Sequence, residues 1–302
     1  MRAIPSQIAI AALAACALLS ACGGGDDSGN SGGATPAPST TPSPSPTPSP
    51  APSPDPLPAP RKGEALPSLS APQTGSTAAV GNGSEGIWSE SMGATFIDNA
   101  GRFVRGDRLG AMSGGFRIAG ATWNFTPDTW ANLGSIDYVT GSGTITPNNR
   151  LDGFYQTAGS DTQTPIHLIY DVANALAVEQ ASIQGDWKQN DFDISVDDQG
   201  NVNGTYTNDT QNCVLTGTAV LAEPGSAKNF YRVTLTASLP TQPAGTICPI
   251  DIGVPLQGYA AIRFVPADGS NLITSKTLYS RSLTMVATTK DGGYLRTQML
   301  KK

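Results

Sequence analysis

The sequence predicts an all-β, antiparallel domain that follows a long proline-rich tether. Three observations carry this prediction. Apolar and polar residues alternate with a period of two on both sides of the turn at residues 198–200 and again in residues 231–239. A Gly-x-Trp motif with a glycine downstream occurs in both halves of that region. In residues 36–60, 12 of 25 positions are proline, which disfavours both helix and sheet.

The first 21 residues have the features of a secretion signal. Arg2 supplies a positive charge, and an apolar run extends from Ile8 to Leu19. A transmembrane helix needs about 20 apolar residues, so this run is too short to span a bilayer and suits a signal-peptide core. We expect residues 1–21 to be removed.

The apolar run ends in Leu19-Ser20-Ala21-Cys22, which resembles the lipobox of bacterial lipoproteins. The resemblance implies that Cys22 becomes the lipidated first residue of the mature chain. In that family an Asp after the Cys retains the protein at the inner membrane. Gly23 stands there instead, which implies a lipid anchor in the outer membrane of a Gram-negative bacterium. The alternative is an ordinary secretory signal in which Cys22 occurs by chance.

Residues 22–84 are predicted to form the anchor and a disordered tether. The alternating Ser/Thr-Pro run at 36–60 favours polyproline II, whose rise of ~3.1 Å per residue gives a reach of roughly 75–80 Å. We interpret it as a stiff spacer; the alternative is a PxxP ligand for a partner domain. Lys62 to Glu85 is rich in Gly, Ser and Ala and is expected to be a flexible lead-in.

Strand signals dominate residues 85–302. Phe192, Ile194 and Val196 alternate with polar residues up to the turn Asp198-Gln199-Gly200, and alternation resumes after it, which predicts a hairpin. Residues 231–239 alternate in the same way. Only residues 171–181 have a pattern compatible with a helix.

The two halves of the domain resemble each other. Gly86-Ile87-Trp88 is followed by Gly101, and Gly185-Asp186-Trp187 is followed at the same spacing by Gly200. Shorter sequence matches relate residues 118–121 to 215–218, 151–154 to 256–259 and 168–170 to 277–279. These matches predict two related half-repeats, 85–182 and 183–290; the alternative is chance similarity between two Gly- and Thr-rich segments.

We expect the halves to join in one pseudo-symmetric barrel of about 8–10 strands, because closure removes the exposed edges that two half-sheets would have. Two packed β-lobes remain the alternative. Trp88 and Trp187 are expected to plug the barrel core. The architecture is broadly similar to lipocalin-like and other small barrels of envelope lipoproteins, a similarity that assigns no binding residue.

Two cysteines remain in the domain, Cys213 and Cys248. In an oxidising compartment they are expected to form a disulfide, which is worth roughly 3–4 kcal/mol on the loop-entropy estimate. The alternative, a nucleophilic thiol, would need a nearby base.

The composition argues against several function classes. A net charge of −6 disfavours nucleic-acid binding, and a single histidine excludes a multi-histidine metal site. His167 has apolar neighbours and is predicted to be a hydrogen-bonded strand residue. Asp191 and Asp193 are expected to point outward, and Asp197 and Asp198 to lie in a turn. We therefore predict no catalytic residue, no metal site and no cofactor.

Aromatic residues provide the remaining candidates for a binding site. Trp123, Phe125, Trp130 and Tyr138 lie in a Gly-rich stretch without clear core periodicity. Exposed rings there would contact a sugar or a protein partner; the alternative is core filling. Trp123, Trp130 and Tyr138 are the candidate ligand contacts.

These expectations define three functional hypotheses. The leading one is a non-enzymatic outer-membrane lipoprotein that presents its barrel to an unknown partner. The second is a barrel that captures a small hydrophobic or sugar ligand, which requires a cavity of a few hundred Å³ at its mouth. The third is a carboxylate-dependent hydrolase of envelope glycans, which requires two suitably spaced inward-facing acids.

Overall fold

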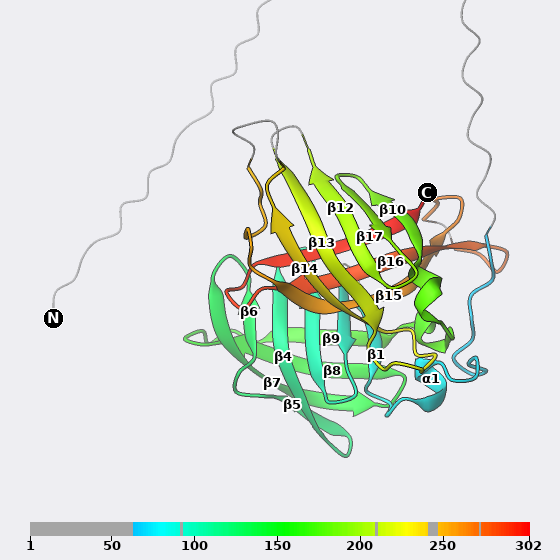
Figure 1. The fold of residues 1–302 in the computed structure, drawn as a ribbon. Coiled ribbons are helices and arrows are strands. Elements are labelled where there is room, and N and C mark those ends of the chain that lie inside the picture. Colours follow the sequence, from blue (N-terminus) through cyan, green and yellow to red (C-terminus); the bar gives the residue numbers. More distant parts are fainter. Residues whose placement is uncertain (1–62, 91–92, 209–210, 241–246, 272) are drawn as a thin grey trace, which may run out of the picture. The chain divides into compact units, whose positions relative to one another are not determined.

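The computed structural model describes residues 63–90, 93–208, 211–240, 247–271 and 273–302. The predicted signal peptide, the lipidation site Cys22 and the proline-rich run all lie outside the described residues. Within them the fold is antiparallel β, with a few short helices, as the alternation predicts (Figure 1). None of the helices in these ranges is long and apolar enough to cross a bilayer.

The first half forms a barrel from nine strands, drawn cyan to green in Figure 1. Consecutive strands pair with each other except β5 and β6, which share one position between β4 and β7. The pairing of β1 with β9 completes the barrel. The strands are β1 (Gly86–Glu90), β2 (Gly93–Ile97), β3 (Arg102–Gly106), β4 (Ala111–Ala119), β5 (Thr122–Phe125), β6 (Trp130–Asn132), β7 (Ile136–Thr146), β8 (Arg150–Thr157) and β9 (Thr164–Tyr170).

The second half forms a separate closed barrel of eight strands, completed by the pairing of β10 with β17. Its strands are β10 (Gly185–Gln189), β11 (Phe192–Val196), β12 (Asn201–Thr207), β13 (Asn212–Leu221), β14 (Tyr231–Ser238), β15 (Leu256–Pro266), β16 (Tyr279–Thr288) and β17 (Tyr294–Lys301). The last strand lies beyond residue 290, where the second half-repeat was expected to end.

The prediction of an all-β fold from two related halves is confirmed, but each half closes on itself instead of sharing one barrel. Closure needs only that a half's first and last strands pair, and both halves satisfy this: Trp88 lies opposite Tyr170, and Trp187 opposite Lys301. Two closed barrels remove exposed sheet edges as well as one larger barrel does.

The halves repeat in structural detail. Gly86 and Gly185 have φ of 127° and 123°, and the indole nitrogens of Trp88 and Trp187 each donate to a carbonyl four residues earlier, at 2.8 Å. The later sequence echoes are not equivalent in space. Residues 151–154 lie in β8, but 256–259 lie in β15, the counterpart of β7. Residues 168–170 end β9, whereas 277–279 lie at the start of β16, the counterpart of β8.

The equivalent of Gly217 is Gly114, not Gly120 as the sequence echo suggested. Gly114 and Gly217 have φ of 159° and 157°. A Cβ on either would come within 2.2 Å of a neighbouring oxygen, on Thr129 or Thr234. Glycine is therefore required at the same bend in both barrels.

Packed side chains fill both barrels. Trp88, Trp123 and Leu151 are fully buried inside the first, and Trp187, Leu215 and Leu256 inside the second, each within a larger apolar cluster. A third cluster joins the outer faces of the two barrels and includes Phe96 and Val104 from one, and Tyr259 and Val286 from the other. Both predicted tryptophan plugs are therefore core residues.

The segment before the first barrel is packed, which corrects the expectation of a flexible lead-in up to residue 84. Glu64 pairs through two backbone hydrogen bonds of 2.8 Å with Tyr279 and forms an ion pair with Arg281. Further along, α1 (Thr77–Val80) has Thr77 buried. Residues 63–84 therefore form a strap, held by backbone hydrogen bonds that the Ser/Gly/Ala composition did not reveal.

The expected helix at 171–181 is instead two short 3₁₀ turns, η1 (Val172–Ala175) and η2 (Gln180–Ile183). Asp171 caps the first turn by accepting a hydrogen bond from the backbone N–H of Ala173. These turns connect the two barrels.

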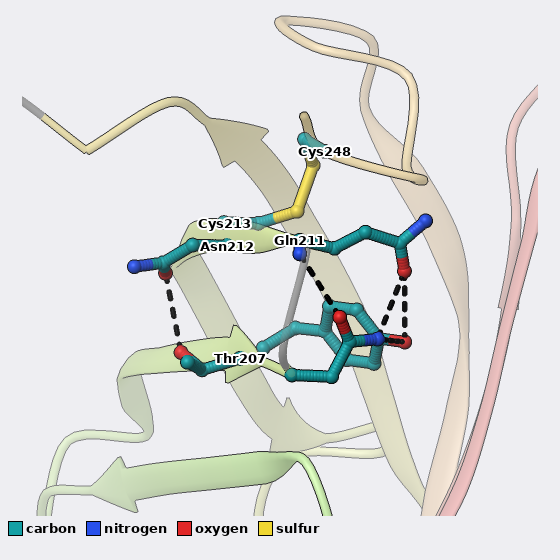
Figure 2. Close-up of a disulfide and its surroundings, with 7 residues drawn as sticks. Thr207, Gln211, Asn212, Cys213 and Cys248 are labelled. Carbon is teal, nitrogen blue, oxygen red and sulfur yellow. Dashed lines mark hydrogen bonds between the residues drawn. A yellow bond between two sulfur atoms is a disulfide. The ribbon is translucent and has the colours of Figure 1, made fainter. Parts of the chain in front are cut away.

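Cys213 and Cys248 form the predicted disulfide (Figure 2). It joins β13 to the connection between β14 and β15, next to a hydrogen bond of 3.0 Å from the Asn212 N–H to the Ile247 carbonyl. Gln211, labelled beside the bridge in Figure 2, is hydrogen-bonded to Asn208. The disulfide therefore holds a long connection against the end of the second barrel.

Candidate ligand groove between the barrels

A groove with a volume of about 670 Å³ lies between the outer faces of the barrels. Strands β3 and β4 and residues 126–130 of the first barrel form one wall, and β14 and β15 of the second barrel form the other. A second cavity of about 330 Å³ shares Ser113, Trp130 and Gln257 with the first. We call the two together the inter-barrel groove.

An interruption between β5 and β6 shapes the first wall. The Thr126 N–H donates to the Gly115 carbonyl at 2.8 Å and the Thr129 N–H to the Thr126 carbonyl at 3.1 Å, which folds residues 126–129 into a tight turn. Strand breaks of this kind redirect side chains. Here the turn leaves Asp128 exposed and is followed by Trp130 at the groove. In the second barrel the equivalent strand, β14, is continuous.

The second wall consists of outward-facing positions of β14 and β15. Arg232 lies directly opposite Tyr259, and Thr234 opposite Gln257. Residues opposite each other in an antiparallel pair point to the same face. The wall therefore presents a cation, a phenol, a hydroxyl and an amide side by side.

Asp98 connects the two walls. Its carboxylate accepts hydrogen bonds from the Arg102 N–H at 2.8 Å, from the Arg102 guanidinium at 2.9 Å and 3.0 Å, and from the Tyr259 hydroxyl of the other barrel at 2.8 Å. Asp98, followed by Tyr259, raises the pKa of Arg102. In the second barrel the carboxylate of the corresponding Asp197 accepts hydrogen bonds from Gln199 and Asn201, which belong to its own turn.

Cations predominate among the charged residues that line the groove. Arg102, Arg117 and Arg232 line the larger cavity and Lys290 the smaller one, and the lining includes one carboxylate, Asp128. The Thr126 hydroxyl, the Asp128 N–H and nearby Arg117 lower the pKa of Asp128. The groove is thus basic in a chain with a net charge of −6.

Trp130 alone among the three predicted ligand contacts lines the groove. It is partly exposed and lies opposite Tyr138, whose side chain is 67% exposed. Trp123 is a core residue: it is fully buried, and its indole N–H donates to the Asp152 carbonyl at 3.0 Å. The ligand-contact prediction for Trp123 is therefore wrong, and the core-filling alternative holds for it.

The glycines of the stretch in which exposed aromatic rings were expected instead leave space for two buried rings, those of Trp123 and Phe125. A Cβ on Gly153 would lie 2.5 Å from the Trp123 ring, and one on Gly141 would lie 2.6 Å from the Phe125 ring. Glycines on β7 and β8 provide the space that these two large rings occupy in the barrel core.

His167 is a hydrogen-bonded strand residue, as predicted. It lies opposite Asp152 across β8 and β9 on the outer surface, with its Nδ1 at 2.8 Å from the carboxylate. Asp193 forms an ion pair with Lys302. These groups lie away from the inter-barrel groove, since none of them lines it.

Sequence reasoning missed Arg102, Arg117, Arg232, Lys290 and Tyr259. Arg102, Arg117 and Arg232 occupy outward strand positions that alternation marks only as solvent-facing. Lys290 lies in the turn after β16, and Tyr259 lies in a largely apolar part of β15, so neither had a sequence signal of its own. The signal that brings them together is the packing of one barrel on the other, which involves residues more than a hundred positions apart, such as Asp98 and Tyr259. Within the described ranges no group of three or more His, Cys, Asp or Glu is arranged to hold a metal.

Three buried tyrosines make the fold sensitive to alkaline pH. Burial raises the pKa of Tyr170, Tyr231 and Tyr259, with further contributions from Glu85 to Tyr170 and from Asp98 to Tyr259. As the pH rises through about 10, the ordinary tyrosine value, the unfolded chain loses these protons while the folded chain keeps them. The free energy of unfolding therefore falls with rising pH.

Absorbance at 295 nm during an alkaline titration checks this. Three of the eight tyrosines should ionise only together with unfolding, whereas all eight should ionise in one step in denaturant. In a Tyr259→Phe variant, two tyrosines instead of three should ionise only together with unfolding. Ionisation of all eight before the fold is lost would contradict the prediction.

Comparisons with protein-family models, with curated proteins and with solved structures give no match to this chain.

Proposed function

We propose that the chain is a lipid-anchored, non-enzymatic binding protein of the bacterial envelope, and that its ligand occupies the inter-barrel groove. The observation that carries the proposal is the placement of Trp130, partly exposed, beside the arginines of the groove. Large aromatic residues and arginine are the side chains that most often contribute to binding.

The location of the cavities supports binding between the barrels. Both interiors are filled by apolar clusters around Trp88 and Trp187, whereas the groove lies on outer faces. A ligand in the groove would touch both barrels at once. This favours the partner-binding hypothesis over capture inside a barrel.

The groove chemistry favours binding over hydrolysis. A glycosidase of the usual kind needs one carboxyl with a raised pKa that donates a proton. Asp128 has a lowered pKa, and the Asp98 carboxylate already accepts bonds from Arg102 and Tyr259. Neither acid is suited to protonate a leaving group.

The envelope location rests on the lipobox. We propose that Cys22 carries the lipid anchor and that the protein is held at the outer membrane. A Cys22→Ser variant should lose incorporation of a labelled fatty acid and should no longer fractionate with membranes. Cys16→Ser is the matched control, because Cys16 lies inside the predicted signal peptide, and it should keep both properties. Labelling of the Cys22→Ser variant would contradict the proposal.

Occupancy of the groove is tested in intact cells with a photo-reactive benzoylphenylalanine at position 130. The matched control is the same substitution at Ile169, which is 53% exposed on β9 and does not line the groove. We expect a discrete cross-linked species from position 130 and none from position 169. Identical outcomes at the two positions would contradict binding in the groove.

A further inference from the structure

We propose that the inter-barrel groove binds an acidic oligosaccharide, a chain of sugars that carries carboxylate or phosphate groups. This inference rests on the proposed function and names the chemistry of its ligand.

Trp130 gives the groove an aromatic surface. Of the four tryptophans, Trp88, Trp123 and Trp187 are fully buried, and Trp130 is partly exposed where the two cavities meet. A flat indole at this place can pack against the C–H face of a sugar ring while the ring's hydroxyls point to neighbouring polar groups. The exposed ring of Tyr138 on the same sheet face extends this surface.

Polar side chains line the groove together with that ring. Ser113, Thr126, Thr234 and Gln257 all line the groove. Hydroxyl and amide side chains both donate and accept hydrogen bonds, as sugar hydroxyls do. A mixed lining of this kind suits a polyhydroxylated ligand better than an apolar one.

The cations of the groove favour an acidic ligand. Arg117 and Arg232 lie in opposite walls of the larger cavity, and Lys290 lines the smaller one. A guanidinium binds carboxylate or phosphate through paired hydrogen bonds. Because cations occur in both cavities, a ligand with acidic groups at intervals along its length matches the groove better than one with a single charge.

The shape argues for a sugar chain over an acidic peptide. The two cavities, of about 670 and about 330 Å³, meet at Trp130, so an extended ligand fits them. Extended peptides commonly bind by adding a strand to an open sheet edge. Both barrels close on themselves in the described part of the chain, so the walls of the groove offer no such edge.

The test measures binding to the full chain by calorimetry and by tryptophan fluorescence. The ligands are tetragalacturonate, a phosphorylated maltotetraose, unmodified maltotetraose and tetraglutamate. We expect at least one of the two acidic sugars to bind at least tenfold more tightly than the neutral sugar and tetraglutamate. Which acidic sugar binds identifies carboxylate or phosphate as the recognised group. Affinity should fall at 0.5 M salt, because salt screens the charges.

Variants connect binding to the groove. Trp130→Ala should weaken binding at least tenfold, and Arg232→Gln and Arg117→Gln at least fivefold each. Lys188→Gln is the matched control, because Lys188 lines a different cavity, and it should bind like the wild type. The thermal unfolding midpoint of each variant verifies that it is folded.

Four results would overturn the inference. Equal binding of tetraglutamate would point to an acidic peptide, and equal binding of the neutral sugar would remove the role of the cations. Binding unaffected by Trp130→Ala and Arg232→Gln would place the ligand elsewhere. Cross-linking from position 130 without affinity for either acidic sugar would reject this ligand class while leaving the proposed binding function intact.

Discussion

Replacing Trp187 with alanine should lower the free energy of unfolding by about 3–5 kcal/mol, the usual cost of truncating a large buried aromatic side chain. Trp187 is 1% exposed in the core of the second barrel, and its indole N–H donates to the Ile183 carbonyl at 2.8 Å. The substitution leaves a cavity and an unpaired buried carbonyl. Trp88→Ala should have an effect of similar size, because Trp88 repeats this geometry in the first barrel.

Denaturant unfolding followed by circular dichroism measures both effects. Trp130→Ala is the matched control: it removes the same side chain from a partly exposed position and should cost much less. Trp187→Phe keeps a ring in the core and should fall between wild type and Trp187→Ala. Equal losses for Trp187→Ala and Trp130→Ala would show that the plug does not stabilise its barrel.

Removal of Lys228 should destabilise the fold by a comparable amount, about 3–5 kcal/mol, because it leaves a buried carboxylate unpaired. The Lys228 ammonium lies 2.9 Å from both oxygens of Glu85 and 2.8 Å from Glu223. Glu85 precedes the first barrel and Lys228 lies between β13 and β14, so the ion pair links the two halves. The side chains of Lys228 and Glu85 are 11% and 4% exposed.

The effect of Lys228→Met should depend on pH. Burial already raises the pKa of Glu85, although Lys228 opposes this, and without Lys228 the rise should increase. Above the ordinary Glu value the folded state then holds a proton that the unfolded chain has lost. The variant's free energy of unfolding should therefore fall as the pH rises, by up to about 1.4 kcal/mol per pH unit within that window.

A second substitution separates this charge effect from lost packing. Glu85→Gln combined with Lys228→Met should recover part of the stability and abolish the pH dependence. The control is Lys302→Met, which removes a lysine from an exposed pair with Asp193 and should cost no more than about 1 kcal/mol. A pH-independent loss in Lys228→Met would contradict the proposed role of the buried carboxylate.

The strands could be predicted from the alternation of apolar and polar side chains along the chain. In β14 the residues with apolar side chains, Tyr231, Val233, Leu235 and Ala237, point inward as the period-two pattern requires. The hairpin between β11 and β12 turns at Asp197 and Gly200, where Gly200 has φ of 84°. The disulfide also followed from the sequence, because only two cysteines remain in the domain.

The arrangement of the two halves was not predictable from the same signals. Alternation gives the inward face of each strand but does not determine which first and last strands meet. The pairing of Trp88 with Tyr170 and of Trp187 with Lys301 closes each half separately. The sequence matches between the two Gly- and Thr-rich halves were also too short to show which residues are equivalent. They aligned Gly217 with Gly120, whereas its structural equivalent is Gly114.

The candidate site was predicted in part. Trp130 was identified because it lies in a Gly-rich stretch without clear core periodicity. The same reasoning misplaced Trp123, whose ring occupies the space beside Gly153 in the barrel core. Arg102, Arg117 and Arg232 had no sequence signal of their own. Their convergence depends on how two outer surfaces meet, a property set by the cluster of Phe96, Val104, Tyr259 and Val286.

The strap changes how the protein would bear a mechanical load. Although residue 63 precedes the first barrel in sequence, its neighbour Glu64 is bonded to Tyr279 and Arg281 of the second. Tension applied to the chain upstream of residue 63 would thus reach the second barrel before the first. Those few bonds would break first, and the freed strap would lengthen the connection while both barrels stayed folded.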